Sequence, residues 1–467
     1  MILQQHYLAC LSQASYLIGD EESATAVVVD PRRDVDVYLE EARRLGLTIR
    51  HVFLTHFHAD FISGHLELAR RAGAEIHLGA RARAEYPFTP AREGDRLEAG
   101  NLRLEVLETP GHTPESISLL VYDLAADPER PHAVLTGDAL FIGDVGRPDL
   151  LASQGFEASE LASMLYDSLH SKLMRLPDAT LVYPAHGAGS ACGKSLSKET
   201  VSTIGAQRKL NYAVQPMSRE QFVELASTGQ PELPAYFAHD AALNRRERPT
   251  LEETLQRSLR PLGLDEVLRM QNAGAVLLDV RDPDDYARVH LAGSTNIGLG
   301  GRFASWAGTL IDRERAIVVV GEPGREREAV LRLGRIGFDQ VAGYLEGGPG
   351  AFEHRADLIA SHPRIDPAEL ARRMGSDRVP LVLDVRTPSE FEAGAIEASL
   401  NVPLAQLERS YGRIPRGREI AVHCQSGYRS SIAASLLEQA GFQPISDLAG
   451  GWQAWEAAQA SPSAPQR

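Results

Sequence analysis

The sequence is poor in cysteine and has no long hydrophobic run. Its 467 residues contain three cysteines, Cys10, Cys192 and Cys424, which are too few and too scattered for a disulfide framework. No segment approaches the ~20 apolar residues of a membrane span, and the N-terminus lacks the basic and apolar regions of a secretory signal. We therefore expect a cytoplasmic protein in which each cysteine is a small buried apolar group or a working thiol.

Positive charge is also scarce. Lys and Arg number 48 against 63 Asp and Glu, so the formal net charge is −15, and no basic stripe offsets it locally. This charge excludes nucleic acid and anionic membranes as partners. The content of 43% hydrophobic and 24% charged residues is typical of globular protein, and a chain of this length predicts roughly three domains.

One short stretch, THFHADF at residues 55–61, concentrates metal-binding side chains. The apolar run at 51–54 predicts a short buried strand, so the following loop delivers His56, His58 and Asp60 from one strand end. Imidazole and carboxylate together suit divalent metals such as Zn, Fe or Mn. Taken alone, the loop is equally consistent with histidines that serve only hydrogen bonds.

Three later strand ends carry residues of the same kind. A predicted strand at 102–107 leads into the loop TPGHTP with His112, a strand at 133–141 delivers Asp138 within GDALF, and residues 180–187 end in His186 within YPAHG. Four strand ends that each present a histidine or an aspartate are hard to explain by chance. Together they predict one metal site at the edge of a sheet.

The series HxHxD, TPGHT, GDALF and YPAHG resembles the metallo-β-lactamase fold, an α/β fold of αββα sandwich type with its metals at strand ends. Hydrolases of the glyoxalase II type carry HxHxDH, in which the last histidine helps to hold a second metal, but this chain has Phe61 there. The pattern is instead similar to the persulfide dioxygenases, which hold one non-heme iron by two histidines and a carboxylate. The resemblance implies one Fe(II) per chain, bound by His56, His112 and Asp138.

The same resemblance places further side chains around the metal. Three residues are expected to orient the ligands and to hydrogen-bond the substrate: His58, Asp60 and His186. Arg147, in the loop GDVGRPD, is a candidate to bind a substrate carboxylate, although a salt bridge with Asp149 explains it equally well. Tyr183 is a second candidate for substrate binding.

Cys192 lies in the glycine-rich loop at 187–194, directly after His186. In persulfide dioxygenases fused to rhodaneses, a cysteine in a similar loop lies close to the iron. Positive charge from Lys194 would favour a thiolate at Cys192, which makes this cysteine a candidate catalytic residue. An inert cysteine in a flexible loop is equally consistent with the sequence.

The C-terminal half is an internal repeat. LLDVRDP at 277–283 recurs as VLDVRTP at 382–388, and STNI at 294–297 recurs as SLNV at 399–402. Each copy alternates predicted strands with helices and ends near a GG pair, so each is a small α/β domain with a parallel sheet. These signals resemble rhodanese domains.

Only the second copy has a thiol after its central strand, where Cys424 opens the loop CQSGYR before a helix. The backbone N–H groups of such a loop lower the pKa of the cysteine and stabilise a persulfide. The spacing C-x4-R is tighter than the C-x5-R of tyrosine phosphatases and suits a sulfur anion. We expect Cys424 and Arg429 to be catalytic, within a persulfide cradle of Gln425, Ser426, Gly427 and Tyr428.

The predicted domain order follows from these motifs. It is a metallo-β-lactamase-fold domain at 1–245, a linker at 246–262, an inactive rhodanese-like domain at 263–360, a catalytic rhodanese domain at 364–459 and a disordered tail at 460–467. The first rhodanese-like copy has GEPGRE at 321–326 without a cysteine, so we expect it to be a structural or docking domain.

The resemblance implies an enzyme of sulfide detoxification and a homo-oligomer. Its iron centre would oxidise a small-molecule thiol persulfide with O2 to sulfite and thiol, and its rhodanese would pass sulfane sulfur through a Cys424 persulfide, forming or using thiosulfate. One alternative is a dinuclear-zinc thioester hydrolase of glyoxalase II type, which Phe61 and the fused sulfurtransferase disfavour. The other is a non-catalytic persulfide sensor or carrier, which needs no open metal site.

Overall fold

The computed structural model describes residues 1–150, 155–230 and 232–460. The chain divides into two units: residues 1–254 with 333–337 form the first, and the rest of the chain forms the second. The predicted disordered tail falls, beyond Ala460, outside the described residues. Within the described part of the chain, we find no helix with the length and apolar character needed to span a membrane.

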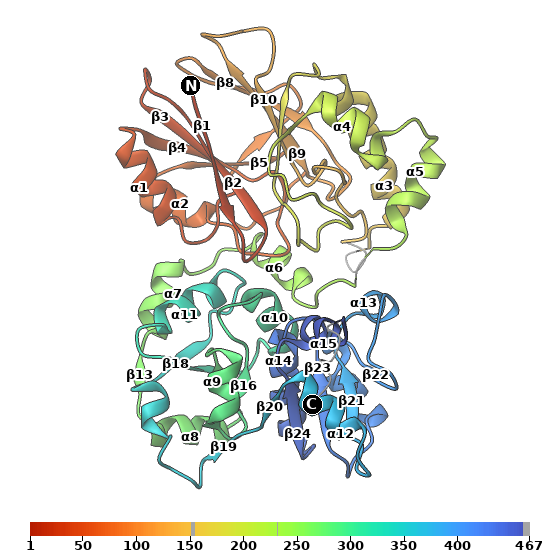
Figure 1. Cartoon of the computed structure of the whole chain (residues 1–467). Coiled ribbons are helices and arrows are strands. Elements are labelled where there is room, and N and C mark those ends of the chain that lie inside the picture. Colours follow the sequence, from red (N-terminus) through yellow and green to blue (C-terminus); the bar gives the residue numbers. More distant parts are fainter. Residues whose placement is uncertain (151–154, 231, 461–467) are drawn as a thin grey trace. The chain divides into compact units, whose positions relative to one another are not determined.

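Two six-stranded sheets form the centre of the first unit (Figure 1). The first sheet has the order β1 (Ile2–Leu8), β2 (Gln13–Asp20), β3 (Thr25–Val29), β4 (Thr48–Phe53), β5 (Glu75–Gly79) and β6 (Thr89–Ala91). The second has the order β12 (Ser202–Thr203), β11 (Leu181–Pro184), β10 (Ala133–Gly137), β9 (Ile117–Asp123), β8 (Leu102–Glu108) and β7 (Arg96–Ala99). The helices are α1 (Asp36–Arg44), α2 (His65–Ala72), α3 (Ala158–Asp167), α4 (Ile204–Leu210), α5 (Arg219–Ser227) and α6 (Phe237–Leu243).

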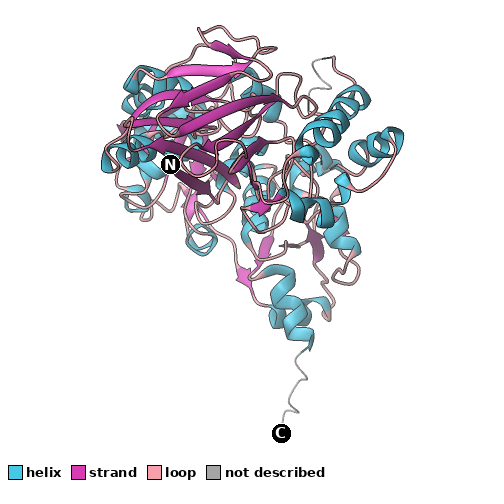
Figure 2. Ribbon diagram, turned by 90° about the horizontal axis from the view of Figure 1, so that it is seen from above, coloured by secondary structure: helices cyan, strands magenta, loops and turns pink. Residues whose placement is uncertain are grey.

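Three hydrophobic layers hold these elements together. On the outer side of the first sheet, Leu17 of β2 packs in one cluster with Tyr38 of α1. Between the sheets, Ile18 of β2 joins Leu119 of β9, and on the outer side of the second sheet Leu165 of α3 belongs to a third cluster. Figure 2 shows the strands of this unit between helices. The layers confirm the predicted αββα sandwich, with β2 buried along its whole length because it has neighbours on both faces.

The strand ends differ from the prediction at one metal-binding motif. The strand expected over 133–141 ends at Gly137, one residue before Asp138. Gly137 has a φ of 53°, and a Cβ at this position would lie 2.6 Å from the hydroxyl oxygen of Thr55. A glycine is therefore required both for the left-handed turn and for the close approach of the Thr55 loop.

The second unit contains two five-stranded parallel sheets, one for each copy of the repeat. The first has the order β13 (Pro261–Leu262), β18 (Val341–Leu345), β17 (Ile317–Val320), β14 (Val276–Asp279) and β16 (Thr295–Asn296). The second has the order β20 (Arg364–Ile365), β24 (Ile445–Leu448), β23 (Ile420–His423), β21 (Leu381–Asp384) and β22 (Leu400–Asn401). A small antiparallel pair joins β15 (His290–Leu291) to β19 (Ile359–Ala360).

Eight helices of the described chain accompany these sheets. They are α8 (Leu264–Asn272), α9 (Pro283–Arg288), α10 (Phe303–Leu310), α11 (Glu326–Gly334), α12 (Pro367–Met374), α13 (Pro388–Glu392), α14 (Tyr428–Gln439) and α15 (Gly451–Ala460). Corresponding side chains make the same contacts in both copies. The Asn296 amide donates to the carbonyls of Asp279 and Arg281. In the second copy the Asn401 amide donates to the carbonyls of Asp384 and Arg386, 105 positions further along the chain.

The segment predicted as a linker, 246–262, is structured. It contains α7 (Leu251–Ser258), in which the division between the two units falls, and the edge strand β13. Pro261 pairs with Tyr344 of β18. An edge strand tolerates proline because its missing N–H would face away from the sheet. The first rhodanese-like sheet therefore begins before residue 263.

Candidate functional site

The structure brings together the three residues expected to hold the metal. His56 follows β4, His112 follows β8 and Asp138 follows β10. The Nε2 atoms of His56 and His112 lie 3.7 and 3.4 Å from Oδ2 of Asp138. All three residues are buried, and each has a ligand atom within 4.8 Å of those of the other two. This spacing fits a single ion at the common edge of the sheets.

The second ring nitrogen of each histidine has its own partner. Nδ1 of His112 donates to the carbonyl of Arg147 at 2.9 Å. Nδ1 of His56 lies 3.0 Å from the hydroxyl of Thr55. Because that hydroxyl donates its hydrogen to Asp30 at 2.8 Å, it accepts a hydrogen bond from the imidazole. Both rings are thus held with a lone pair on Nε2, the tautomer that a metal ligand needs.

The inward-facing atoms fit a cation. Among the described residues, neither Nε2 of His56 and His112 nor either carboxylate oxygen of Asp138 has a hydrogen-bond partner. Leaving such buried atoms unpaired costs about 1–3 kcal/mol each, and a bound divalent ion would satisfy them together. Burial lowers the pKa of His56 well below its ordinary value and also lowers that of His112, so both rings are neutral and ready to bind a metal.

The three residues predicted to surround the ligands form an adjoining buried group. His186 Nδ1 lies 3.5 Å from Asp60 Oδ2, and His186 Nε2 lies 3.6 Å from Asp138 Oδ1. His58 Nε2 lies 2.9 Å from Asp30 Oδ1. Burial acts to lower the pKa of His58, but the charge of Asp30 outweighs it and raises that pKa. One ring nitrogen of His58 thus faces Asp30, while ligand atoms of His58, Asp60 and His186 lie within 4.8 Å of one another.

Arg147 is buried, and both sides of its guanidinium are occupied. It makes a bidentate pair with Asp149, with distances of 2.7 and 2.8 Å, and donates to the carbonyl of Ala191 at 3.0 Å. The salt bridge that the sequence allowed is therefore present, and it leaves the predicted substrate contact without support. Through its carbonyl, which accepts from His112, Arg147 instead joins the metal site to the loop before Cys192.

The loop that carries Cys192 is held in place by Asp144. Oδ2 of Asp144 accepts from the backbone N–H groups of Lys194 and Ser195 at 2.7 and 2.6 Å, and Oδ1 accepts from the Tyr212 hydroxyl at 2.6 Å. The Cys192 thiol lies within 4.8 Å of ligand atoms of Asp138 and His186. The expected position beside the metal site is thus observed.

The expected activation of Cys192 by Lys194 is wrong. The Lys194 ammonium donates to the Leu225 carbonyl at 2.6 Å instead of facing the thiol. Burial raises the pKa of Cys192 well above its ordinary value, and the carboxylates of Asp60 and Asp138 raise it further. Only a positive charge within the site, such as a bound metal, would favour the thiolate here.

Tyr183 lies on β11, where its ring meets Tyr16 edge-on at a centroid distance of 5.5 Å and packs against the cluster between the sheets. Its role in substrate binding stays a prediction.

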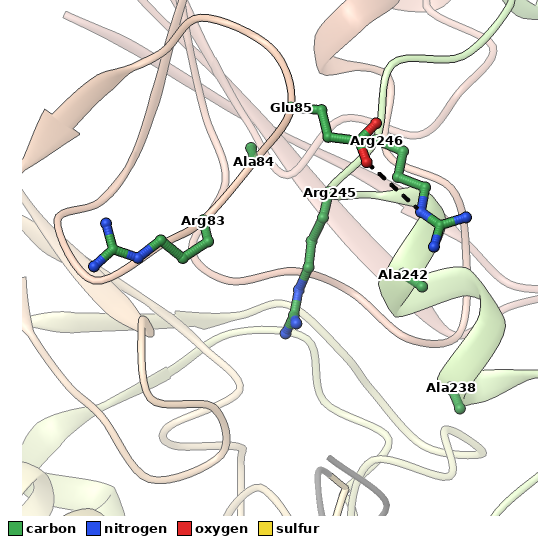
Figure 3. A pocket seen from close by; sticks show the side chains of 7 residues that line it. All are labelled: Arg83, Ala84, Glu85, Ala238, Ala242, Arg245 and Arg246. Atoms are coloured by element: carbon green, nitrogen blue, oxygen red, sulfur yellow. Dashed lines mark ion pairs between the residues drawn. The ribbon is translucent and has the colours of Figure 1, made fainter.

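A cleft of about 560 Å³ in the first unit is lined in part by Arg83, Arg245 and Arg246. Figure 3 shows Arg246 turned toward Glu85, at 3.9 Å, while Arg83 and Arg245 extend away from that pair. The Arg245 guanidinium lies 5.1 Å from the ring centre of Phe57, the residue between His56 and His58. Three arginines and one glutamate thus line the cleft, and one of the arginines contacts the loop of the metal ligands.

In the second unit, Cys424 is buried at the end of β23, before α14. The N–H of Gly427 donates to its sulfur at 3.1 Å, and the Ser430 hydroxyl lies 3.5 Å from the same atom. Gly427 has a φ of 93°, which turns its N–H toward the sulfur. The loop has the shape expected of an anion cradle.

Two predicted members of this site use their side chains elsewhere. The Arg429 guanidinium makes a bidentate pair with Glu390 of α13, with distances of 2.8 and 2.6 Å. The Tyr428 hydroxyl donates to the Gly298 carbonyl of the first copy at 2.7 Å, so Tyr428 offers the cradle only its backbone.

The first copy keeps the shape of this loop without its thiol. Gly321 occupies the place of Cys424, and Gly324 has the same φ of 93° as Gly427. In both copies a glycine of the following GG pair, Gly348 or Gly451, approaches the backbone at the start of the loop so closely that a Cβ would clash.

Four residues of these sites were not predicted from sequence: Asp30, Thr55, Asp144 and Glu390. Asp30 follows β3 and makes a fifth strand end that carries a histidine or an aspartate, which was the available signal. Glu390 lies three residues after Thr387 and forms a capping box with it. In the sequence this pattern indicates the start of a helix, and it gives no sign that Glu390 pairs with Arg429.

Comparison with known proteins agrees with this arrangement. Residues 8–186 match the metallo-β-lactamase superfamily model, and residues 263–354 and 366–458 each match the rhodanese-like domain model. The chain belongs to the metallo-β-lactamase superfamily. It combines a domain of that superfamily with two rhodanese-like domains.

Two curated relatives and one solved structure illustrate the similarity. The mitochondrial persulfide dioxygenase ETHE1 of Homo sapiens is 32% identical over 231 residues, which cover 48% of this chain and 80% of the relative. A hydroxyacylglutathione hydrolase of Hahella chejuensis is 33% identical, with 48% and 77% coverage. The crystal structure of a metallo-β-lactamase from Staphylococcus aureus subsp. aureus COL is 33% identical, covers 73% of this chain and 98% of its own, and has a TM-score of 0.66.

Proposed function

We propose that this superfamily member is a persulfide dioxygenase coupled to a rhodanese sulfurtransferase. The observation that carries the proposal is the buried set of His56, His112 and Asp138, whose inward-facing atoms have no hydrogen-bond partner among the described residues, with Phe61 beside it. Two imidazoles and one carboxylate with open positions suit one Fe(II). The reaction would convert a thiol persulfide, O2 and water into the thiol, sulfite and two protons.

Fe(II) held by these ligands would supply the activation of O2 and the oxidation of the outer persulfide sulfur. The protein supplies the rest. Thr55 and Arg147 orient the two ligand imidazoles, and the apolar ring of Phe61 excludes water from the side of His58. His186 and Asp60, which lie 3.5 Å apart, would hydrogen-bond the substrate or hold a proton released from it.

The second activity would reside in the Cys424 loop. The Cys424 thiolate attacks the outer sulfur of a persulfide, a Cys424 persulfide forms, and the carrier thiolate leaves. Sulfite then attacks the outer sulfur of that persulfide, which yields thiosulfate and restores the thiolate. The Gly427 N–H, which donates to the sulfur, stabilises the anion at each stage. The reverse reaction would use thiosulfate.

The arginine-lined cleft favours a carrier thiol with acidic groups. Three arginines, Arg83, Arg245 and Arg246, line the cleft against one glutamate, Glu85, and the Arg245 guanidinium packs on the Phe57 ring. An anionic carrier, such as a peptide thiol or a phosphorylated thiol, would gain from this field. A neutral small persulfide would gain nothing from it.

The thioester hydrolase remains the rival because a hydroxyacylglutathione hydrolase is among the relatives. The deciding measurement is the metal content of the purified chain together with O2 uptake on a panel of acidic and neutral persulfides. We expect about one iron per chain and O2 consumption that requires a persulfide. Two zinc ions per chain with thioester hydrolysis would overturn the proposal, and sulfur binding without turnover would indicate a sensor.

The two activities are separable by substitution. Cys424→Ser removes the nucleophile, so we expect sulfur transfer to or from thiosulfate to disappear while persulfide-dependent O2 uptake persists. Sulfur transfer that survives this substitution would contradict the role given to Cys424.

A further inference from the structure

The second unit contains a second buried group of metal-binding side chains, apart from the Cys424 loop. His290 lies on β15 of the first copy, His362 lies between the copies and Glu438 lies on α14 of the second copy. His290 is 0% exposed and His362 is 7% exposed. One ligand atom from each of the three residues lies within 4.8 Å of the other two.

The ring nitrogen of His290 that faces the carboxylate of Glu438 carries no hydrogen when the ring is neutral. Its Nδ1 donates to the Tyr286 carbonyl at 2.8 Å, so a neutral ring carries a lone pair on Nε2. That Nε2 lies 3.3 Å from both oxygens of Glu438. A lone pair and a carboxylate at this distance repel each other unless a proton or a cation lies between them.

The surroundings of His362 favour a cation, and not a proton, between His290 and Glu438. Among the described residues, neither of its ring nitrogens has a hydrogen-bond partner, although both are buried. A neutral imidazole carries one nitrogen lone pair, and at His362 this lone pair is available to a metal that lies between the ring and its two neighbours. A proton shared by His290 and Glu438 would leave both His362 nitrogens unsatisfied, which is costly in a buried position.

The group also has access to solvent. His362 and Glu438 line a cleft of about 400 Å³ together with Ser361, Pro363, Gln443 and Pro444. A metal with three protein ligands keeps its fourth position for water or another small ligand, and this cleft would supply it.

We propose that His290 Nε2, a ring nitrogen of His362 and the carboxylate of Glu438 bind one divalent cation of the zinc class. Two imidazoles and a carboxylate form a suitable ligand set for that class. In the second copy Ala395 stands at the position of His290, so that copy lacks this ligand.

The location gives the ion a structural role. Its ligands come from the first copy, the segment between the copies and α14, the helix that begins at the Cys424 loop. Binding would therefore stabilise the contact of the two copies and the position of α14. The inference does not depend on the dioxygenase proposal, since it concerns none of the residues of the first unit.

The test is titration of the metal-free full-length chain with Zn(II) by calorimetry. We expect His362→Ala to bind one equivalent fewer than the unsubstituted chain, and Zn(II) to raise the unfolding temperature of the second unit only when His362 is present. His354→Ala is the matched control, because His354 is 90% exposed and lies outside the group.

Glu438→Gln preserves the size of the side chain and provides a second test in case His362→Ala does not fold. We expect Zn(II) to bind this site at least tenfold more weakly when the carboxylate is lost. If His362→Ala and Glu438→Gln both bind as many equivalents with the same affinity as the unsubstituted chain, the group is a hydrogen-bonded cluster and the proposed site does not exist.

Discussion

The ring of Phe61 lies 4.4 Å from the ring of His58, centroid to centroid, and 6.4 Å from the ring of His186. Phe61 is 1% exposed and occupies the position at which the glyoxalase II type of sequence has a histidine. Next to the buried group of His58, Asp60 and His186, this position therefore offers an apolar ring and no ligand atom. A second metal would face carbon where it needs a nitrogen ligand.

Phe61→His should convert the site toward two metals. The new imidazole would join His58, Asp60 and His186, so we expect the metal content to rise from about one to about two equivalents per chain and persulfide-dependent O2 uptake to fall at least tenfold. Elemental analysis and an oxygen electrode measure both quantities. Phe61→Leu is the control and should keep one equivalent; one equivalent in Phe61→His would show that Phe61 does not set the metal number.

Asp30 should position the metal ligands without touching the metal. It accepts from the backbone N–H and the hydroxyl of Thr55, each at 2.8 Å, and lies 2.9 Å from His58 Nε2. Asn keeps the size and tolerates the left-handed φ of 51°. We expect Asp30→Asn to weaken metal binding by about 10–100-fold, as the loss of such supporting partners typically does.

Competition with a chelator measures that affinity, and Asp36→Asn, at an exposed position, is the control. If the iron affinity of Asp30→Asn is unchanged while only the unfolding temperature falls, Asp30 supports the fold and not the ligands.

Cys192→Ser should separate metal binding from turnover. The thiol lies beside Asp138 and His186 but is not one of the three proposed ligands. We expect iron content to be unchanged and the rate of persulfide oxidation to fall several-fold, because the substrate loses a sulfur neighbour at the site. Unchanged steady-state rates with several persulfides would assign Cys192 to packing alone.

Glu390 should make the second unit sensitive to acid. Burial acts to raise its pKa, but the Arg429 pair outweighs burial and lowers the pKa to about 2. A lowered pKa stabilises the folded state above the ordinary value of 4.5, and the contribution is lost as the pH falls toward 2. We expect about 1 kcal/mol from this pair, since Glu390 is partly exposed to solvent.

Urea unfolding between pH 6 and pH 2.5 measures this effect. Glu390→Gln should lose less stability than the unsubstituted chain over that range, and Glu392→Gln serves as the control on the same short helix. Parallel pH profiles for all three proteins would contradict the role of the Arg429 pair.

The sequence by itself determined the order of the domains and the gathering of histidines and aspartates at strand ends, whereas the choice of His56, His112 and Asp138 as ligands came from the resemblance to the persulfide dioxygenases. Buried strands are recognisable as apolar runs. The residues just beyond them include His56, His112 and Asp138, and histidine and aspartate at such positions are residue types that few other roles require. The repeat with a period of 105 residues was visible for the same reason, since both copies bury equivalent strands. The tight loop at Cys424 was predicted because loop geometry is a local property.

Tertiary structure alone decided which charges meet. Lys194 is two residues from Cys192, yet its ammonium bonds to Leu225, because side-chain direction and not sequence distance sets a contact. The Glu390 pair with Arg429 joins elements 39 positions apart. His290 and Glu438 are separated by 148 positions, and no local pattern relates them. Such long-range pairs depend on how the sheets and helices pack, which no short stretch of sequence records.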